Sequence, residues 1–363
     1  MNTHNMLTYD YMIVGAGLFG ATCAYLLSDK KVLVIDKRNH IGGNVYTELS
    51  NGIHIHKYGA HIFHTSNKHI WDFVNRFVYF QPYTHQVIAN YNGDIYNLPI
   101  NMNTFYQLYG ISDVDELKMH IDNWDKQIQN PTNIEEYAVK MIGKKGYETL
   151  IKGYTEKQWN VSCDKLPIDI IKRIPIRTNW DNNYFDDLYQ GIPVDGYTPM
   201  IQKMLSNADV MLNTSFNIKE HYNIADKIIY CGSVDELFDY VLGKIPYRSL
   251  QFIEQQSNIS LDAPVVNFTS PDVPYTRVID HKLFLQSTNN IQQSILTYEY
   301  PYPITEGEPY YPIITQENMM LYAQYVDMLK QYPKIVLGGR LGLYKYIDMD
   351  DTIELAMNLC NYI

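Results

Sequence analysis

The hydrophobic pattern at the N-terminus changes from strand-like to helical and back within a short stretch. An apolar run over 11–14 precedes glycines at positions 15, 17 and 20, and a helical pattern then continues to about residue 27. A second apolar run over 31–35 ends at Asp36. Short apolar runs bounded by turn residues are typical of buried strands. The order strand, glycine turn, helix, strand therefore predicts a βαβ unit in a parallel sheet.

Similar apolar runs occur far downstream. Residues 227–230 precede Cys231-Gly232, and residues 334–337 precede a Gly-Gly-Arg sequence. Because both runs match the first two in length and composition, we expect further buried strands of the same layer. A helix is expected over 235–242.

A different pattern follows the first βαβ unit. Residues 85–91 and 94–98 flank Asn92-Gly93, a dipeptide that adopts the positive φ angles of a two-residue turn. This pattern predicts an antiparallel hairpin.

The chain then becomes helical before it returns to strands. The periodicity is helical over 101–172, and Ser112 and Asn133 each stand three residues before an acidic residue, which predicts two helix starts. Short strand-like runs follow at 265–268 and 282–285, and a Pro- and Tyr-rich loop at 301–312 comes after them. Helical and antiparallel parts are therefore expected as insertions in the parallel layer.

The three N-terminal glycines have the spacing G-x-G-x-x-G. Gly15 permits a tight turn, Gly17 lets backbone amides approach a pyrophosphate, and Gly20 lets the helix pack closely on the strand. Asp36 lies 21 residues after Gly15 (36 minus 15), where its carboxylate can accept hydrogen bonds from ribose hydroxyls. A 2′-phosphate would be repelled there. The motif in this context predicts a site for FAD or NAD rather than NADP.

The segments that follow favour FAD. Residues 36–44, DKRNHIGGN, resemble the second glycine loop of the glutathione-reductase-like FAD superfamily, and 338–340 with 346–350 resemble its closing segment. Asp351 and Glu354 are expected to start the last helix in a capping-box-like arrangement. The sequence shows no second glycine fingerprint for a nicotinamide nucleotide and no C-x-x-C pair of a disulfide reductase. An external donor must therefore reduce the flavin.

The expected fold is α/β with α+β insertions. It consists of a Rossmann-like FAD domain of the glutathione-reductase-like superfamily, an inserted helical bundle and an antiparallel β-sheet domain. The expected boundaries are 1–77, 195–247 and 316–363 for the FAD-binding domain, 101–172 for the helical domain, and 78–100, 173–194 and 248–315 for the sheet domain.

Charge and cysteine content narrow the class of protein. The net charge of −11 argues against nucleic-acid binding, which usually needs a basic face. The four cysteines are far apart, which disfavours a zinc site and a secreted disulfide framework and favours a cytoplasmic location. The uncharged stretch 11–27 is at the short limit for a membrane span and carries the glycine motif, so no membrane association is expected.

Three local groups of residues suggest a polar, anionic ligand. The histidine-rich segment 54–65 has no Cys or carboxylate partner nearby, so structural histidines are favoured over a metal site. The segment 153–159, GYTEKQW, places aromatic faces beside polar groups, which suits a nucleobase or sugar as well as core packing. Lys172-Arg173 and the PYTR sequence ending at Arg277 offer guanidinium groups for phosphate or for the protein surface.

Taken in order, these motifs resemble those of the UDP-galactopyranose mutase family. The matching segments are HKYGAHIFHT, GYTEKQW, PYTR, YEYP, PYYP and GRLGLYKYIDMD, and the resemblance runs from about Tyr11 to the C-terminus. It implies FAD that is active when reduced, and an isomerase that interconverts UDP-galactopyranose and UDP-galactofuranose for surface glycan synthesis. It further implies that the reduced flavin forms a covalent adduct with the sugar while UDP is held nearby.

The resemblance also implies roles for individual residues. Arg173, on an expected mobile lid, and Arg277 match the diphosphate arginines, and both are expected catalytic residues together with His61. Leu150 and Ile151 stand where the family often has bulky aromatics, which is a departure in the expected uracil site. The expected cofactor-binding residues are Gly15, Gly17, Leu18, Phe19, Gly20, Asp36, Lys37, Gly43, Asn44, His61, Ile62, Arg340, Tyr346, Asp348 and Met349. The expected substrate-binding residues are Thr84, Ile151, Tyr154, Thr155, Trp159, Arg173, Tyr184, Arg248, Asn267, Arg277, Glu299, Tyr311 and Tyr346.

Other functions stay open at this point. The sugar could carry a 2-acetamido group, as in UDP-N-acetylgalactosamine. An amine-oxidase-type flavin oxidoreductase would share the FAD fold but would transfer electrons to oxygen. A non-catalytic binding protein would be colourless when purified. The expected partners are the UDP-sugar, an external reductant such as NAD(P)H or a reductase, and a second copy of the chain in a homodimer.

Overall fold

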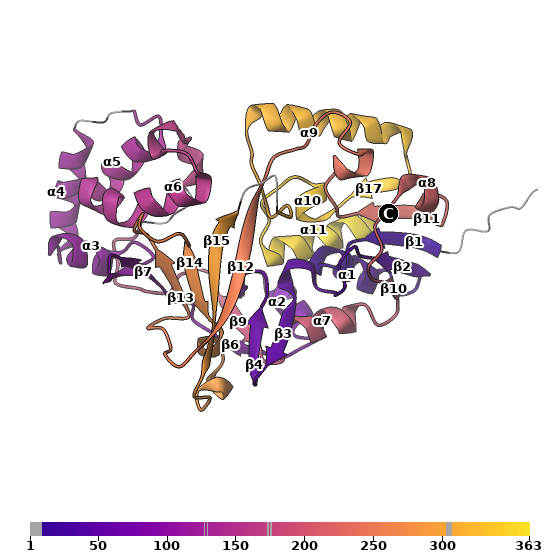
Figure 1. Ribbon diagram of the computed structural model, residues 1–363, viewed down its shortest axis with the longest axis horizontal. Coiled ribbons are helices and arrows are strands. Elements are labelled where there is room, and N and C mark those ends of the chain that lie inside the picture. Colours follow the sequence, from indigo (N-terminus) through magenta and orange to yellow (C-terminus); the bar gives the residue numbers. More distant parts are fainter. Residues whose placement is uncertain (1–8, 127, 129, 173, 175, 303–306) are drawn as a thin grey trace, which may run out of the picture. The chain divides into compact units, whose positions relative to one another are not determined.

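The computed structural model describes residues 9–126, 128, 130–172, 174, 176–302 and 307–363 (Figure 1). The chain divides into two compact units. The first unit contains Met1–Pro82, Asp187–Leu250 and Tyr302–Ile363, and the second contains Tyr83–Asp186 and Gln251–Pro301. Each unit is therefore built from segments that are distant in the sequence.

The first unit is built on a parallel sheet. Its strands pair in the order β10–β2–β1–β11–β17. The predicted strands at 11–14, 31–35, 227–230 and 334–337 all belong to this one layer, which confirms the prediction. The observed bounds are Asp209–Met211 (β10), Val32–Ile35 (β2), Tyr9–Val14 (β1), Ala225–Tyr230 (β11) and Ile335–Leu337 (β17).

Helices cover the two faces of this sheet. Helix α1 (Leu18–Leu26) packs beside α11 (Met349–Tyr362) and α7 (Tyr197–Met204) (Figure 1). Their core continues into a group of buried aromatic side chains that includes Phe63, Phe73 and Phe80. The opposite face of the sheet packs against the buried ring of Tyr325 from α9 (Gln316–Met328).

Shorter elements complete the first unit. Its remaining strands and helices are β3 (Thr47–Ser50), β4 (Ile53–His56), β5 (Phe63–Thr65), α2 (Lys68–Val74), β6 (Phe80–Pro82), β9 (Tyr189–Pro193), α8 (Ile218–His221), β16 (Tyr311–Pro312) and α10 (Gly339–Gly342). Strand β3 pairs with β4, and β9 pairs with both β5 and β6. Strand β16 pairs with the first residues of β12 (Tyr247–Ser257), a strand whose residues from Gln251 onward belong to the second unit.

The second unit contains a largely antiparallel sheet. Its strands follow the order β12–β15–β14–β13–β7–β8, and the β13–β7 pair is parallel. The predicted hairpin is confirmed as β7 (Val87–Tyr91) and β8 (Asp94–Leu98), with positive φ at Asn92 (55°) and Gly93 (95°). The remaining strands are β13 (Val265–Phe268), β14 (Arg277–Asp280) and β15 (Ser294–Tyr302).

Helices form the rest of the second unit around their own hydrophobic core. They are α3 (Met102–Tyr109), α4 (Val114–Asp125), α5 (Ile134–Gly146), a π-helical turn (Tyr147–Lys152) and α6 (Gly153–Trp159). The predicted start at Asn133 is confirmed, because its side chain accepts a hydrogen bond from the amide of Glu136. The start predicted at Ser112 is wrong by one residue, because the Asp113 carboxylate caps α4.

Three other local predictions are wrong. Only a 3-10 turn (Glu236–Phe238) forms within 235–242, because the Asp235 carboxylate accepts a hydrogen bond from the distant amide of Ile245. Residues 282–284 lie in a 3-10 helix (His281–Phe284) that is capped by Asp280 and followed by Leu285, so the predicted strand does not form. The last helix begins at Met349 after Asp348, so Asp351 and Glu354 lie inside it.

A helix that crosses a membrane must be long and apolar. Within the residues that the structure describes, no helix combines the length and the apolar character that crossing a bilayer requires.

Candidate functional site

The two glycine loops of the first unit touch backbone to backbone. Gly17 forms an isolated parallel bridge with Gly42, and a Cβ atom added to Gly43 would lie 2.9 Å from the Cα atom of Gly17. A Cβ atom on Gly20 would lie 2.0 Å from the carbonyl oxygen of Gly15, so α1 packs directly on the turn. Gly15 itself has a φ of 112°. The close contact at Gly20 and the positive φ angles at Gly15, Gly42 and Gly43 require glycine there, whereas a Cβ atom on Gly17 would make only an ordinary 3.7 Å contact with Gly43.

The start of α1 is available to an anion. Its N-cap is Gly17, whose position has no side-chain cap, and no acidic residue stands in the first turn. The first amides of a helix carry a partial positive charge and lack intrahelical partners. The Leu18 and Phe19 side chains are buried, so a ligand at this helix start would meet backbone amides. This arrangement fits the pyrophosphate of a dinucleotide.

Asp36 connects the two loops. Its Oδ2 accepts a 2.7 Å hydrogen bond from the amide of Ala16, and its Oδ1 accepts a 2.8 Å bond from the amide of Arg38. The side chain is buried, at 8% exposure. Each carboxylate oxygen has a second lone pair, so both can still accept a ligand hydroxyl. Asp36 therefore orders the loops and fits the predicted ribose contact.

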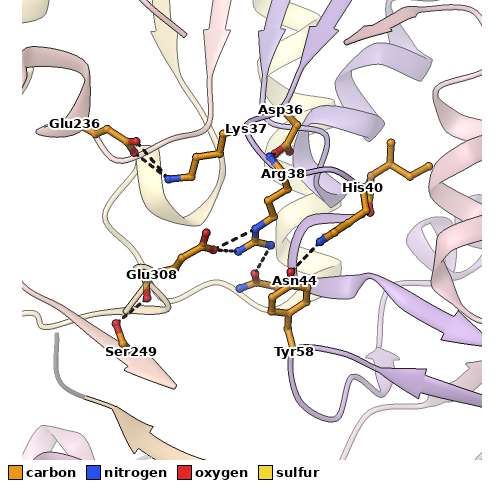
Figure 2. Close-up of polar contacts among 10 residues, drawn as sticks. Asp36, Lys37, Arg38, His40, Asn44, Tyr58, Glu236, Ser249 and Glu308 are labelled. Carbon is orange, nitrogen blue, oxygen red and sulfur yellow. Dashed lines mark hydrogen bonds and ion pairs between the residues drawn. The ribbon is translucent and has the colours of Figure 1, made fainter. Parts of the chain in front are cut away.

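A polar network surrounds Arg38, a residue that the sequence analysis did not select. Figure 2 shows its guanidinium between Glu308 and Asn44. Arg38 Nη2 lies 2.5 Å from Glu308 Oε2, and Nη1 donates a 3.1 Å bond to Asn44 Oδ1. The guanidinium also lies over the ring of Tyr58, 4.4 Å from its centroid. A basic residue two positions after Asp36 was a visible signal, whereas nothing local indicated Tyr58 or Glu308.

Charge pairing sets the protonation of this network. Burial raises the pKa of Glu308, but the nearby guanidinium of Arg38 outweighs it and the net pKa is lowered. Glu308 is thus a carboxylate at neutral pH. Lys37, a predicted cofactor residue, forms an exposed ion pair of 3.3 Å with Glu236 (Figure 2). Its ammonium group therefore pairs with a side chain of the protein.

The C-terminal glycine loop adjoins the first one. Gly339 has a φ of 67°, and a Cβ atom on Gly338 would lie 2.3 Å from the ring of Phe19. Arg340 follows and places its guanidinium 5.0 Å from the ring centroid of Tyr310 and 5.3 Å from that of Tyr311. These close approaches hold the loop against the start of α1.

Aromatic side chains extend this loop toward α11. The rings of Tyr311 and Tyr346 lie 5.4 Å apart. Asp348 is the N-cap of α11 and Met349 is its first residue, so the amides of a second helix start lie in the same unit. Arg248 pairs with Tyr311 across β12 and β16, and burial lowers the pKa of its guanidinium. These contacts bring the predicted residues Arg248, Tyr311, Tyr346, Arg340 and Asp348 into one neighbourhood.

His61 is held by backbone contacts. Its Nδ1 lies 2.8 Å from the carbonyl oxygen of Gly59, which selects the tautomer protonated at Nδ1. Its amide donates a 3.1 Å bond to Nδ1 of His56, and its carbonyl accepts a 3.0 Å bond from the hydroxyl of Tyr197. The following residue, Ile62, is buried. The ring is therefore oriented by its own loop.

In the second unit, predicted substrate residues form one row across the sheet. Asn267 on β13 pairs with Arg277 on β14, and Arg277 pairs with Glu299 on β15. Cross-strand partners point to the same face of a sheet, so the three side chains share a face. Arg277 Nη1 lies 3.8 Å from Glu299 Oε2, and Nη2 donates a 3.3 Å hydrogen bond to the hydroxyl of Tyr154 on α6.

The row combines a cation with acceptor groups. The Glu299 side chain is 5% exposed and that of Arg277 is 29% exposed. Burial raises the pKa of Tyr154, so the phenol stays protonated beside the guanidinium. Asn267 Oδ1 is buried and accepts no hydrogen bond from any residue that the structure describes. A ligand with anionic oxygens and a donor group would satisfy both Arg277 and Asn267.

The remaining predicted residues have mixed surroundings. Thr155 is buried on α6, Ile151 lies in the hydrophobic core of the helices, and the partly buried Trp159 packs against that core. Thr84 is exposed, and the amide of Tyr184 donates a 2.9 Å bond to the carbonyl of His85. Arg173 lies outside the described residues.

Within the described ranges, no group of three or more His, Cys, Asp and Glu residues is placed to hold a metal ion.

Comparison with known proteins identifies the family. A model described as UDP-galactopyranose mutase matches residues 149–346, more than half of the chain, and a model for an NAD(P)-binding Rossmann-like domain matches residues 13–77. This chain belongs to the UDP-galactopyranose mutase family. A relative from Klebsiella pneumoniae, "Probable UDP-galactopyranose mutase", is 38% identical and the match covers 98% of this chain and 94% of the relative. A relative from Escherichia coli, "dTDP-fucopyranose mutase", is 37% identical with coverage of 95% and 96%.

Solved structures agree on the fold. The "Crystal structure of reduced UDP-Galactopyranose mutase" matches with a TM-score of 0.75 at 15% identity and covers 98% of this chain and 94% of that one. A redesigned putrescine oxidase matches with a TM-score of 0.55 at 11% identity. The amine-oxidase alternative therefore shares the fold, whereas the full-length relatives above belong to the mutase family.

Membership in the UDP-galactopyranose mutase family confirms several predictions. The fold is the predicted Rossmann-like α/β fold. The protein is a flavin-dependent isomerase, and its cofactor is FAD. The paired glycine loops, the uncapped start of α1 and the buried carboxylate of Asp36 fit that cofactor.

Proposed function

We propose that this chain interconverts UDP-galactopyranose and UDP-galactofuranose. The observation that carries the proposal is the row of Asn267, Arg277 and Glu299 with the Tyr154 hydroxyl on its guanidinium. A diphosphate is dianionic, and this chain has a net charge of −11, so recognition must come from a few placed cations. Arg277 supplies one of them in a partly buried setting, where its charge is weakly screened.

The cofactor and the side chains of the row are proposed to have separate roles. When bound, reduced FAD would supply an electron-rich ring nitrogen for covalent catalysis at the anomeric carbon. Arg277 holds the diphosphate as it leaves and keeps it available for return. Glu299 orients the guanidinium through charge, and Tyr154 orients it through its hydroxyl. Arg173 is proposed as the second diphosphate cation.

The remaining residues are proposed to hold the ends of the ligands. In the first unit, Asp36 binds the adenosine ribose, the amides of α1 bind the pyrophosphate, and His61, Arg340, Tyr346 and Asp348 surround the flavin. Further substrate contacts are proposed for Thr84, Ile151, Thr155, Trp159, Tyr184, Arg248, Asn267 and Tyr311.

Substitution of Arg277 tests the proposed function. With dithionite-reduced enzyme, Arg277→Ala is expected to lower kcat/KM for UDP-galactofuranose by about 10²–10³, the usual cost of losing a charge-stabilising donor. Arg76→Ala, which removes a guanidinium that lies over Phe73 in the first unit, is the matched control. Activity of Arg277→Ala near wild type would show that the diphosphate assignment is wrong.

A second candidate substrate is dTDP-fucopyranose, because the relative with that name is nearly as similar to this chain as the galactose-type relative. Chromatography of reduced enzyme with UDP-galactose, UDP-N-acetylgalactosamine and dTDP-fucose decides between them. The proposal requires the highest kcat/KM with UDP-galactose. A higher kcat/KM with dTDP-fucose would mean that the natural substrate of this site is a deoxy sugar. A higher kcat/KM with UDP-N-acetylgalactosamine would mean that it is a 2-acetamido sugar.

The cellular setting is also proposed. The enzyme is expected in the cytoplasm as a homodimer, reduced by NAD(P)H or a reductase, and supplying galactofuranose for surface glycans. The three-domain boundaries predicted from the sequence remain part of this proposal. Size-exclusion chromatography with light scattering tests the dimer, and anaerobic bleaching of the flavin by NADH or NADPH tests the reductant.

A further inference from the structure

The ammonium group of Lys157 lies in an unusual environment. It stands on α6, one turn after Tyr154, and its Nζ donates to two backbone carbonyls, Phe268 O at 2.8 Å and Tyr275 O at 2.9 Å. Both acceptors are neutral. Burial lowers the pKa of Lys157 from 10.5 to about 8, so the side chain bears a desolvation cost. Lysine side chains are usually exposed, so the burial of this one suggests a structural role.

The two carbonyls belong to the hairpin that carries the diphosphate row. Phe268 directly follows Asn267 on β13, and Tyr275 stands two residues before Arg277 on β14. The amide of Phe268 donates a 2.9 Å bond to the carbonyl of Thr276, so the strands are still joined at this end. Lys157 therefore bridges both strands next to their substrate residues.

A second contact holds α6 on the same hairpin. A Cβ atom added to Gly153 would lie 2.2 Å from the carbonyl oxygen of Thr269, so the helix backbone rests directly on the loop after β13. Gly153 and Lys157 stand on either side of Tyr154 along α6. The Tyr154 hydroxyl can then meet Arg277 Nη2 at 3.3 Å only if α6 and the hairpin keep this relative position.

We propose that Lys157 is a positioning residue for diphosphate recognition: by bridging Phe268 and Tyr275 it fixes α6 on the β13–β14 hairpin and holds the Tyr154 hydroxyl against the Arg277 guanidinium. The inference deepens the proposed function and rests on it, because Arg277 must bind the diphosphate. Lys157 itself acts through Tyr154 and Arg277. An arginine at this position retains the donors and the charge, whereas a methionine retains only the approximate length.

The experiment measures UDP affinity of the reduced holoenzyme by titration calorimetry. Lys157→Met is expected to raise the Kd for UDP about tenfold, the equivalent of about one lost hydrogen bond, while Lys157→Arg restores it to within about threefold of wild type. Lys145→Met is the matched control, because Lys145 also donates to a backbone carbonyl, Leu108 O, in the same unit. Both methionine variants should lose thermal stability to a similar degree, but only Lys157→Met should lose UDP affinity.

A double-variant cycle with Tyr154→Phe separates positioning from general destabilisation. If Lys157 acts through Tyr154, Lys157→Met should change the Kd by less than about twofold in the Tyr154→Phe background. Equal effects in both backgrounds, or equal loss of UDP affinity in Lys145→Met, would overturn the inference. If Arg277→Ala leaves UDP affinity unchanged, the proposed function fails. If only the Lys157 variants leave it unchanged, the positioning role alone fails.

Discussion

The carboxylate of Asp36 accepts a 2.7 Å hydrogen bond from the backbone amide of Ala16, a residue inside the first glycine loop. The same side chain accepts a bond from the amide of Arg38 in the second loop. One buried acid therefore orders both loops of the FAD site and also keeps lone pairs for a ribose hydroxyl.

Replacement of Asp36 should weaken FAD binding more than it weakens the fold. Asp36→Asn places a donor NH₂ where one of the two amides now donates, so one buried N–H loses its acceptor and one ribose contact is lost. We expect the Kd for FAD to rise at least about tenfold. Fluorescence titration of the apoprotein with FAD measures this. Unchanged affinity would show that Asp36 serves only the loop backbone.

The first glycine loop offers a matched pair of alanine substitutions. Gly20→Ala places a Cβ atom 2.0 Å from the carbonyl oxygen of Gly15, so the backbone must shift, and we expect the free energy of unfolding to fall by about 2–3 kcal/mol. Gly17→Ala meets only Gly43 Cα at 3.7 Å, and its cost to the fold should stay below about 1 kcal/mol.

The same pair separates folding from cofactor binding. Because Gly17 is where the pyrophosphate approaches the backbone, Gly17→Ala should still lose FAD affinity. Denaturant unfolding and FAD titration of both variants test this. Equal destabilisation by the two substitutions would contradict the packing argument.

The Arg38–Glu308 pair predicts an acid-sensitive contribution to FAD affinity. The net pKa of Glu308 is lowered in the folded protein, so the contribution of the pair is present above the ordinary carboxyl pKa and is lost as pH falls through the lower folded value. Glu308→Gln should therefore raise the Kd for FAD at pH 7 but converge on wild type at low pH.

Arg38 should matter more than Glu308 for the same ligand. Arg38→Met also loses Asn44 and the face of Tyr58, so its effect at pH 7 should exceed the roughly two- to fivefold effect of Glu308→Gln. FAD titrations of single and double variants at pH 7 and well below the ordinary carboxyl pKa of 4.5 measure both effects. A Glu308→Gln effect that does not depend on Arg38 would rule out the pair as its cause.

Lys157 should produce a pH dependence of stability with a defined sign. Its folded pKa of about 8 lies below the ordinary value of 10.5, so between these values the unfolded chain binds more protons than the folded one. Stability must then rise with pH relative to a variant without the amine. The neutral amine still has two N–H groups for its two carbonyls, so the contacts persist.

The measurement is the difference in unfolding free energy between wild type and Lys157→Met. It should grow in favour of wild type from pH 7.5 to pH 9.5. A Lys157 difference that is flat over this range would mean that the ammonium group is not desolvated in the folded protein.

The features that the sequence determined by itself are local. The spacing of Gly15, Gly17 and Gly20 predicted the dinucleotide turn, because Gly15 needs a positive φ and Gly20 packs directly on the Gly15 carbonyl. Asn92-Gly93 predicted the hairpin, since both residues adopt positive φ. Asn133 predicted a helix start that its side chain does cap.

Errors arose where a carboxylate accepts a hydrogen bond that the hydrophobic pattern does not show. Asp235 was expected to start a helix, but its carboxylate accepts a hydrogen bond from the amide of Ile245. Residues 282–285 were expected to form a strand, but the Asp280 carboxylate accepts a bond from the amide of Lys282 and starts a 3-10 turn there. Strand β10 is too short and too exposed to stand out as an apolar run.

The site residues show the same division. Sequence motifs selected Tyr154, Arg277 and Glu299, but only the tertiary structure brings them together: the strand register pairs Arg277 with Glu299, and α6 brings the Tyr154 hydroxyl to Arg277. Glu308 was not selected, because it lies 270 residues from Arg38 along the chain. Short-range backbone geometry is encoded by neighbouring residues, whereas ion pairs and cross-strand contacts depend on how the whole chain folds back on itself, and only the tertiary structure decided them.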